Sequence, residues 1–165
     1  MRQLAIIITA LWVAASVWFV SMRIEFNQNC VGFLKQAADA NTIELALDRL
    51  ERAIHYVEKK GWTEGYTSVL WRTEDENIGF WYTNLKASHK ELICAKDSPQ
   101  YEQTNVLMKL RESLTENTGD GTSITFPMGL WKYPYNGLYA AFIFVVNLLM
   151  LVAVFIYAAW LDGQL

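Results

Sequence analysis

Two long apolar segments without charge, one near each end of the chain, constrain its fold more than any other feature. Leu4–Met22 is a run of 19 residues, and Leu138–Leu161 is a run of 24 residues in which Asn147 is the only strongly polar side chain. An α-helix rises about 1.5 Å per residue, so about 20 residues cross the roughly 30 Å hydrocarbon core of a bilayer. Because lipid offers the backbone no hydrogen-bond partner, such a span must be helical. The sequence therefore predicts two transmembrane helices.

The charged residues lie between these two segments. Of the 165 residues, 14 are basic and 17 acidic, and all but Arg2 and Asp162 fall within residues 23–137. The sequence thus predicts a tail and first transmembrane helix over 1–22, an extramembrane domain over 23–137, a second transmembrane helix over 138–161 and a short tail over 162–165. The net charge of −3 argues against a protein that binds nucleic acid through its phosphates.

The first apolar segment has a second interpretation, a cleaved signal peptide. It is longer than the apolar core of roughly 7–15 residues that such peptides carry, and Val20-Ser21-Met22 is not a small-x-small cleavage site. We therefore expect an uncleaved signal anchor. Arg2 before it favours a cytoplasmic N-terminus, and two spans place both termini on one side. We expect a protein of the bacterial inner (plasma) membrane, with both termini cytoplasmic and residues 23–137 extracytoplasmic, as a periplasmic domain.

Helix signals dominate the middle of the chain. The first transmembrane helix meets no helix breaker before about Ala40, Asn41 is a good N-cap, and Thr73 with Glu76 forms a capping-box pattern. The helices are expected over about 23–40, 41–61, 74–95 and 99–117. Gly65–Trp71 and Thr122–Phe126 are rich in strand-forming residues and are expected to pair. The predicted fold is an all-α membrane protein in which two transmembrane helices flank a bundle of three or four helices, with a small two-stranded β element.

Cys30 and Cys94 are the only cysteines. In an exported domain an even pair predicts a disulfide. A straight up-and-down bundle argues against it, because Cys30 would lie about 12 Å above the membrane and Cys94 about 30 Å above it. A disulfide requires the two Cα atoms to lie within about 7 Å. The alternatives are therefore a disulfide, or two unbridged thiols that pack as small apolar side chains.

Asn147 is the most informative polar residue, because an unpaired amide in the middle of a membrane span is costly. Matching depths on antiparallel helices places it near Ser16 of the first span. We therefore expect either a hydrogen bond between these two helices or a contact between Asn147 and another subunit.

Aromatic residues gather in two segments, 61–72 and 118–135, which the predicted bundle places near the bilayer surface. Such residues anchor proteins at the membrane interface and are also enriched in protein-binding surfaces. The candidate interface or partner-binding aromatics are Trp62, Tyr66, Trp71, Trp131, Tyr133 and Tyr135.

Signatures of catalysis are missing from the sequence. It contains no nucleophile elbow, no phosphate-binding loop and no dinucleotide fingerprint. His55 and His89 have no further ligands at zinc-binding spacing. We expect a non-catalytic protein without metal or cofactor.

The sequence thus favours an interaction protein over an enzyme. The first hypothesis is a membrane-anchored accessory or assembly subunit that acts through its extracytoplasmic helical domain and its transmembrane helices. Its expected partners are the lipid bilayer and either another membrane protein or a second copy of the chain. The alternative is an extracytoplasmic sensor or ligand-binding protein, which would signal laterally to a membrane partner because only four residues follow Leu161.

Overall fold

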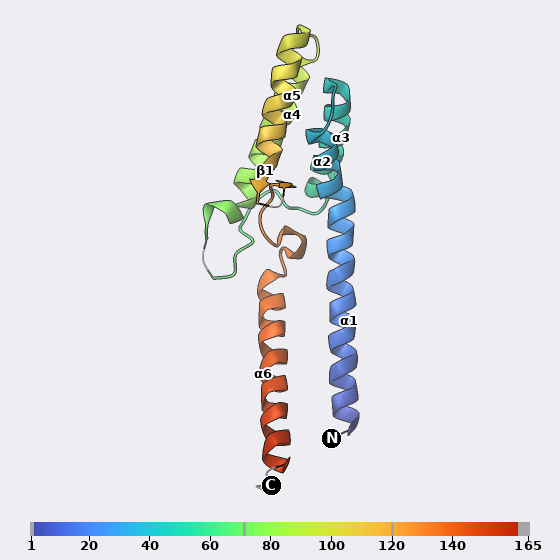
Figure 1. Ribbon diagram of the computed structural model, residues 1–165, viewed down its shortest axis with the longest axis vertical. Coiled ribbons are helices and arrows are strands. Elements are labelled where there is room, and N and C mark those ends of the chain that lie inside the picture. The colour runs from blue at the N-terminus through green and yellow to red at the C-terminus, as the bar shows by residue number, and fades with distance from the viewer. Residues whose placement is uncertain (1, 71, 120, 162–165) are drawn as a thin grey trace.

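Two long helices leave one end of a helical body in the same direction. The computed structural model describes residues 2–70, 72–119 and 121–161. The long helices are α1 (Arg2–Phe26) and α6 (Asn136–Leu161), and the middle of the chain forms the body, called the helical domain below. The N-terminal end of α1 and the C-terminal end of α6 both lie at the end of the molecule remote from this domain (Figure 1). Among the described residues, Thr9–Ala38 and Asn136–Ala153 form helices long and apolar enough to be candidate membrane spans.

The first helix continues into the domain, as the sequence predicts. α1 passes into a π-helical turn, η1 (Asn27–Val31), and then into α2 (Gly32–Ala38). The amide of Gly32 donates to the carbonyl of Asn27, which is the wider i→i−5 pattern of a π-turn. Phe26, Cys30 and Leu34 are 1%, 0% and 0% exposed, so one face of this continuous helix forms a wall of the domain core.

The next helix, α3 (Ile43–Lys59), packs on η1 and α2. Its N-cap is Thr42, whose Oγ1 accepts from the amide of Leu45 at 3.3 Å. The prediction of Asn41 as the cap is therefore wrong by one residue, because the backbone first becomes helical after Thr42. The buried face follows the amphipathic pattern of the sequence and consists of Ile43, Ala46, Leu50, Ala53, Ile54 and Val57.

A second pair of helices, α4 (Ile78–Ala95) and α5 (Gln100–Leu114), completes the domain. α4 starts later than predicted. The Thr73 hydroxyl donates to the Glu76 carboxylate at 2.8 Å, as the capping-box pattern predicts. This pair spans a separate 3-10 turn, η2 (Glu74–Glu76), and therefore does not cap α4. Asn77 has an extended backbone and is the true N-cap, since its Oδ1 accepts from the amide of Phe80 at 3.0 Å.

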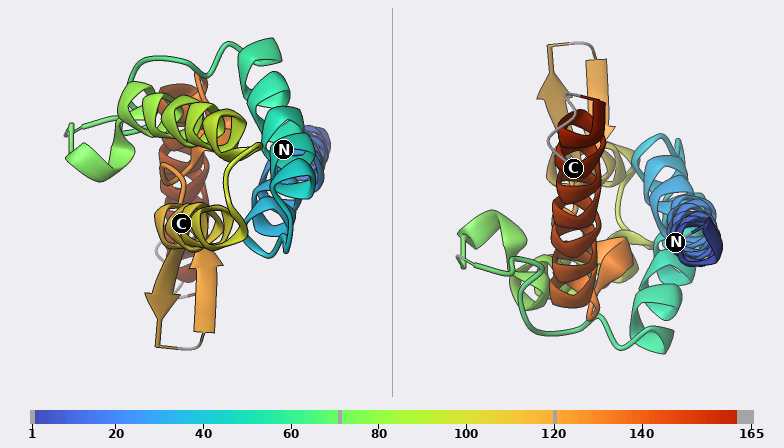
Figure 2. Two further views of the ribbon diagram at one scale, coloured as in Figure 1. Left: turned by 90° about the horizontal axis from the view of Figure 1, so that it is seen from above. Right: turned by 90° about the horizontal axis from the view of Figure 1, so that it is seen from below.

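The small β element exists, but its predicted pairing is wrong. β1 (Thr115–Thr118) pairs antiparallel with β2 (Gly121–Ile124), with Thr115 opposite Ile124. Two strands that follow each other closely lose less chain entropy on pairing than two strands separated by about 50 residues. The hairpin projects from the side of the domain (Figure 2). Tyr66, in the segment expected to be the other strand, forms only an isolated bridge with Asn77.

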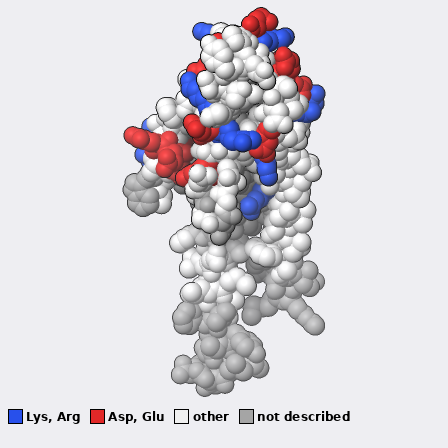
Figure 3. Space-filling model, turned by 45° about the horizontal axis from the view of Figure 1, so that its top comes forward, with Lys and Arg blue, Asp and Glu red and all other residues white. Residues whose placement is uncertain are grey.

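The core lies between the pair α2–α3 and the pair α4–α5. Buried apolar side chains from all four helices form one cluster, which includes Leu34, Leu50, Ile78, Leu92 and Leu110. Charged side chains cover the outside of the domain and are not seen along the lower helices (Figure 3). This division between a charged domain and apolar long helices matches the pattern in the sequence.

Polar contacts join the helices at the surface of the domain. The Tyr82 hydroxyl of α4 donates to Glu58 of α3 at 2.6 Å, and Lys86 lies 3.2 Å from the same carboxylate. The hydrogen bond from Tyr82, followed by the nearby charge of Lys86, lowers the pKa of Glu58, and the same bond raises the pKa of Tyr82. Exposed pairs of this kind add little stability, so the apolar cluster holds the helices together.

The two cysteines are free thiols in the structure and do not form the disulfide considered above. Cys30 is completely buried in η1, which packs against α3, whereas Cys94 is exposed near the far end of α4. The continuous first helix fixes Cys30 close to the base of the domain, and this separates the two residues.

This difference in exposure predicts selective labelling. N-ethylmaleimide should modify Cys94 of the folded protein and reach Cys30 only after denaturation, because a thiolate must meet the reagent in solvent to react. Peptide mass spectrometry measures both sites, and Cys94→Ser should remove native-state labelling. Equal labelling of the two cysteines in the folded protein, or a mass change on reduction, would contradict the structure.

Candidate interaction site at the base of the domain

The base of the domain, from which α1 and α6 extend, is held together by aromatic rings from three distant segments. The ring centroid of Phe26 at the end of α1 lies 5.8 Å from that of Trp62 and 5.1 Å from that of Phe126. Tyr56 of α3 lies 5.7 Å from Trp62. All three pairs have the edge-to-face geometry that aromatic side chains prefer. Residues separated by up to 100 positions in the chain therefore meet in one cluster.

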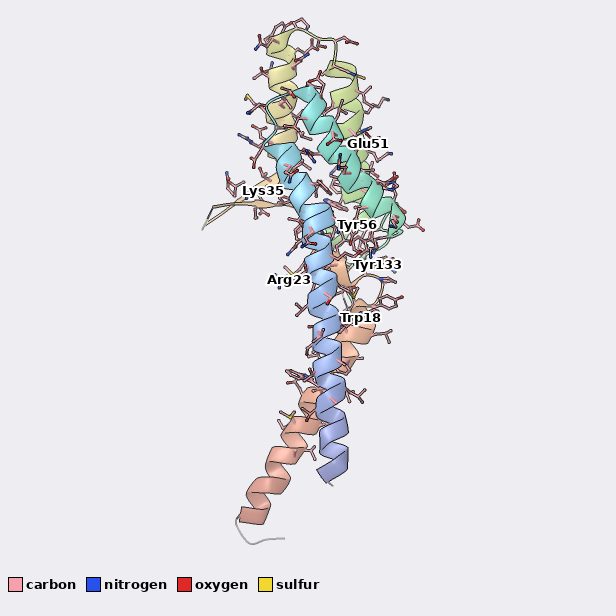
Figure 4. All side chains as sticks on the ribbon, turned by 90° about the vertical axis from the view of Figure 1, so that its right-hand side faces the viewer. Trp18, Arg23, Lys35, Glu51, Tyr56 and Tyr133 are labelled. Atoms are coloured by element: carbon pink, nitrogen blue, oxygen red, sulfur yellow. The ribbon has the colours of Figure 1, made fainter. Side chains whose placement is uncertain are left out.

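Trp62 and Tyr133 join the two segments of the base. Trp62 is 4% exposed, and its Nε1 donates to the backbone carbonyl of Tyr133 at 3.1 Å. The Tyr133 side chain lies against Gly65, where a Cβ would collide with the phenol oxygen. Gly65 also has a φ of +101°, which a side chain would disfavour. Figure 4 shows Tyr133 at the junction between the domain and the long helices. Both aromatics therefore contribute to the internal packing of the base.

The long helices meet just below this cluster. Phe19 of α1 lies 4.2 Å from the ring of Tyr139 on α6 and 6.2 Å from Trp131 of η3 (Leu130–Lys132). The Lys132 ammonium lies 4.6 Å from the centre of the Tyr139 ring and 5.2 Å from that of Trp131, in cation–π geometry. These contacts fix where α6 starts relative to α1.

The remaining aromatics predicted from the sequence have different surroundings. Tyr66 is half-buried, accepts from the side chain of Asn77 at 3.3 Å and has Arg72 over its ring. Tyr135 is 54% exposed. Trp71 lies outside the described residues. The structure thus gathers Trp62, Trp131 and Tyr133 into the base and leaves Tyr135 open to contact.

Asn147 and Ser16 are not paired. Asn147 Nδ2 donates to the carbonyl of Ile143 at 2.7 Å, and the Ser16 hydroxyl donates to the carbonyl of Trp12 at 2.9 Å. Each side chain therefore bonds within its own helix. The reason is geometric: below the contact between Phe19 and Tyr139 the helices lie apart, as the view along the long axis shows (Figure 2). The hydrogen bond between the two spans considered above is not formed.

Most apolar side chains on both long helices are exposed as a result. Between Thr9 and Met22, and between Gly137 and Ala153, none of the described side chains is classed as buried. Exposed large residues include Trp18 at 66%, Leu138 at 71% and Phe144 at 69%. Such surface is stable only against lipid or against other apolar chains.

One face of α6 and the loops above it form an open groove of about 720 Å³, called the α6 groove below. The α6 side of this groove consists of Asn136, Tyr139, Ala140, Ile143, Phe144 and Asn147. Its upper end is formed by the segment 67–70 together with Glu76, Met128, Gly129 and Lys132. Asn136 Nδ2 donates to the carbonyl of Thr67 at 2.6 Å and ties the two parts together. Sequence reasoning did not find this groove, because its polar residues come from two segments, 67–76 and 132–147, that lie 56 or more positions apart.

A second groove of about 550 Å³, the α4–α5 groove, crosses the domain. Apolar side chains such as Trp81, Leu114 and Phe126 line it together with Glu74, Asp75 and Asn84. Phe80, which also lines it, is 64% exposed although its neighbour Trp81 is buried.

The part of the chain that the structure describes contains no arrangement of ligands for a metal. Within residues 2–70, 72–119 and 121–161, no three His, Cys, Asp or Glu side chains lie close enough together to hold an ion. His55 is exposed on α3, and His89 is half-buried on α4.

Comparison with known proteins adds no assignment, since no family model, no curated protein and no solved structure matches this chain. The functional proposals therefore rest on the geometry of the base and of the two grooves.

The hydrogen bond between Trp62 and Tyr133 can be tested directly. Trp62→Phe keeps a ring in the aromatic cluster but removes the Nε1 donor and leaves the carbonyl of Tyr133 unpaired. The free energy of unfolding should fall by about 1–3 kcal/mol, measured by denaturant titration of the detergent-solubilised protein.

The matched control is Trp18→Phe, since Trp18 is exposed on α1. It should leave stability nearly unchanged. Equal effects of the two substitutions would show that Trp62 does not hold the base together.

Proposed function

We propose that the protein is a membrane-anchored interaction subunit, an accessory or assembly component that performs no catalysis. In this proposal α1 and α6 cross the bilayer, and the helical domain stands outside it. The protein binds another membrane protein, or a second copy of itself, through its transmembrane helices and its domain.

The exposed amide of Asn147 carries the proposal. Asn147 lies eleven residues after Asn136, the first residue of α6, which places it about 16 Å along the helix and close to the middle of a bilayer. Its Nδ2 bonds to Ile143, and no described residue donates to its Oδ1. Lipid tails have no donor to offer, so a second helix that brings one gains a hydrogen bond in the membrane.

The separation of α1 and α6 supports the same conclusion. Because the two helices touch at their domain ends, most of each helix is open to another chain. Ala10 and Ala14 on α1, and Ala141 on α6, are exposed small residues that allow another helix backbone to approach closely.

The α4–α5 groove supports a contact at the level of the domain. It combines an apolar floor, an exposed aromatic residue in Phe80 and a rim with Glu74, Asp75 and the ion pair between Glu91 and Lys109. An apolar centre with a polar rim is the usual anatomy of a protein interface.

The second candidate function is an extracytoplasmic sensor, and the size of the α4–α5 groove favours it. A volume of about 550 Å³ falls within the range of roughly 300–1,000 Å³ found for small-molecule sites. A sensor should be stabilised against heat by its ligand in the absence of any protein partner, whereas an assembly subunit should be stabilised by the partner alone.

The membrane proposal predicts a topology. We propose a location in the bacterial inner membrane with both termini cytoplasmic, supported by Arg2 before the first span and by the exit of both long helices from the same end of the domain. Protease added to intact spheroplasts should digest the domain, and a cytoplasmic marker protein should stay intact. Digestion only after lysis would reverse the topology.

The role of Asn147 predicts the effect of one substitution. Asn147→Leu should reduce co-purification of the partner from detergent extracts by about three- to thirtyfold, which corresponds to the about 0.6–2 kcal/mol of a hydrogen bond between membrane helices. Quantitative mass spectrometry of affinity-purified protein measures the ratio.

Two control variants sharpen this experiment. Asn147→Gln retains an amide and should retain most of the partner, and Ser16→Ala should have no effect because Ser16 bonds its own helix. A strictly monomeric protein without any partner, or full retention by Asn147→Leu, would refute the proposal.

A further inference from the structure

Two buried polar atoms at the upper end of the α6 groove have no partner among the described residues. They are the hydroxyl oxygen of Thr67 and the amide oxygen of Asn136. Thr67 is 3% exposed, and hydrogen bonds hold its backbone on both sides. Its amide donates to the backbone carbonyl of Glu76 at 3.0 Å, and its own carbonyl accepts from the Asn136 side chain at 2.6 Å. Buried polar atoms without a partner are rare because they lose the hydrogen bonds of water. A ligand in the groove would provide these hydrogen bonds.

The same end of the groove contains both signs of charge. The ammonium of Lys132 lies over the rings of Trp131 and Tyr139, and no described carboxylate forms an ion pair with it. Gly129 leaves space for its stem, since a Cβ there would lie 3.1 Å from Lys132 Cε. Glu76 also lines the groove. The upper end of the groove therefore combines the cation of Lys132, the anion of Glu76, the hydroxyl of Thr67 and the amide oxygen of Asn136.

The rest of the groove is mostly apolar, with Ser68 and Asn147 as its other polar residues. Tyr139, Ala140, Ile143 and Phe144 line it on successive turns of α6, and the exposed side chains of Val69, Leu70 and Met128 form its upper walls. A ligand that fits is polar at one end and apolar along its length.

The position of α6 in the proposed membrane identifies this amphiphile as a lipid, a step that rests on the proposed function. Asn136 begins the span, so the polar end of the groove lies at headgroup depth and the apolar part lies beside the acyl chains. A partner helix that followed this face along its whole length would meet the segment 67–70 and Met128 at the upper end of the groove. A lipid ends at the headgroup and meets no such obstacle.

We propose that the α6 groove is a specific site for a phospholipid of the phosphatidylethanolamine class. The phosphate accepts hydrogen bonds from Lys132 and from the hydroxyl of Thr67. The primary ammonium of the headgroup donates to Asn136 Oδ1 and pairs with Glu76. The upper parts of the acyl chains lie along Ala140, Ile143 and Phe144. The α6 groove thereby accepts a headgroup that has an anion and a hydrogen-bonding cation side by side.

The choice of headgroup can be tested because phosphatidylcholine has the same phosphate but no N–H donor. The full-length protein is reconstituted in nanodiscs with equal amounts of the two lipids and released for native mass spectrometry. We expect the retained lipid to be enriched in phosphatidylethanolamine by about tenfold, the effect of one charge-assisted hydrogen bond. Equal retention of the two lipids, or retention of neither, would overturn the proposal.

Substitutions separate the headgroup contacts from the fold. Thr67→Val preserves the shape of the side chain and Lys132→Met preserves its length. Each should lower the retention of both lipids severalfold, because both lipids carry the phosphate that Thr67 and Lys132 bind. Lys35→Met, at an exposed position on α2, is the matched control and should leave this retention unchanged. Circular dichroism confirms that the variants are folded.

A further pair of variants tests the apolar half of the groove. Ile143→Trp fills it and should reduce lipid retention, whereas Val145→Trp, which does not line the groove, should not. Loss of retention in both variants would assign the lipid to the general surface of α6 and contradict the site.

The outcome is independent of the partner experiment, because lipid retention is measured on the isolated protein. If Asn147→Leu loses the partner but the protein retains both lipids equally, the lipid proposal is refuted and the proposed interaction function stands. If the protein retains phosphatidylethanolamine selectively but has no protein partner, the proposed interaction function is refuted and the lipid proposal stands. A site-specific cross-link from Phe144 to a partner helix would assign the groove to that helix and refute the lipid proposal.

Discussion

The packing of Phe26 between Trp62 and Phe126 is the contact on which the rest of the structure depends. It joins the end of the first helix to a loop after α3 and to the segment that leads into α6. The hydrogen bond from Trp62 to the carbonyl of Tyr133 fixes the same junction through a polar contact. The aromatic base thereby positions the starts of both long helices, which touch at Phe19 and Tyr139 and lie apart below that contact.

This separation links the two proposals. Helices that packed on each other would cover their own apolar surfaces, whereas most of the apolar surface of α1 and α6 is exposed. In the two proposals the bilayer and another chain cover it. Asn147, at the lower end of the α6 groove, supports a protein contact at mid-membrane depth, and the upper end of the same groove supports a lipid at headgroup depth. The two proposals together require the partner helix to cross α6 at Asn147 and to diverge from it towards the domain.

The elements that follow from periodicity were predictable from sequence. The continuous first helix and the buried face of α3 depend on spacing within one segment, and the structure confirms both. The wrongly predicted helix caps arose where neighbouring residues compete for the same position. Thr42 displaced Asn41 as a cap, and Asn77 displaced Thr73, because several adjacent residues have side chains able to cap a helix. The strand pairing failed for a related reason, since Thr115–Thr118 offered β2 a nearer partner than Gly65–Trp71.

The sequence by itself determined that the chain has two apolar helical segments around a charged helical middle, because hydropathy and helical spacing are properties of consecutive residues. The tertiary structure alone decided which side chains meet. It buried Trp62 and turned Phe80 outward, kept Asn147 and Ser16 apart, and brought Thr67, Lys132 and Asn136 to one groove. Contacts between residues 60 or more positions apart depend on how helices of given lengths pack, and no local pattern encodes that packing.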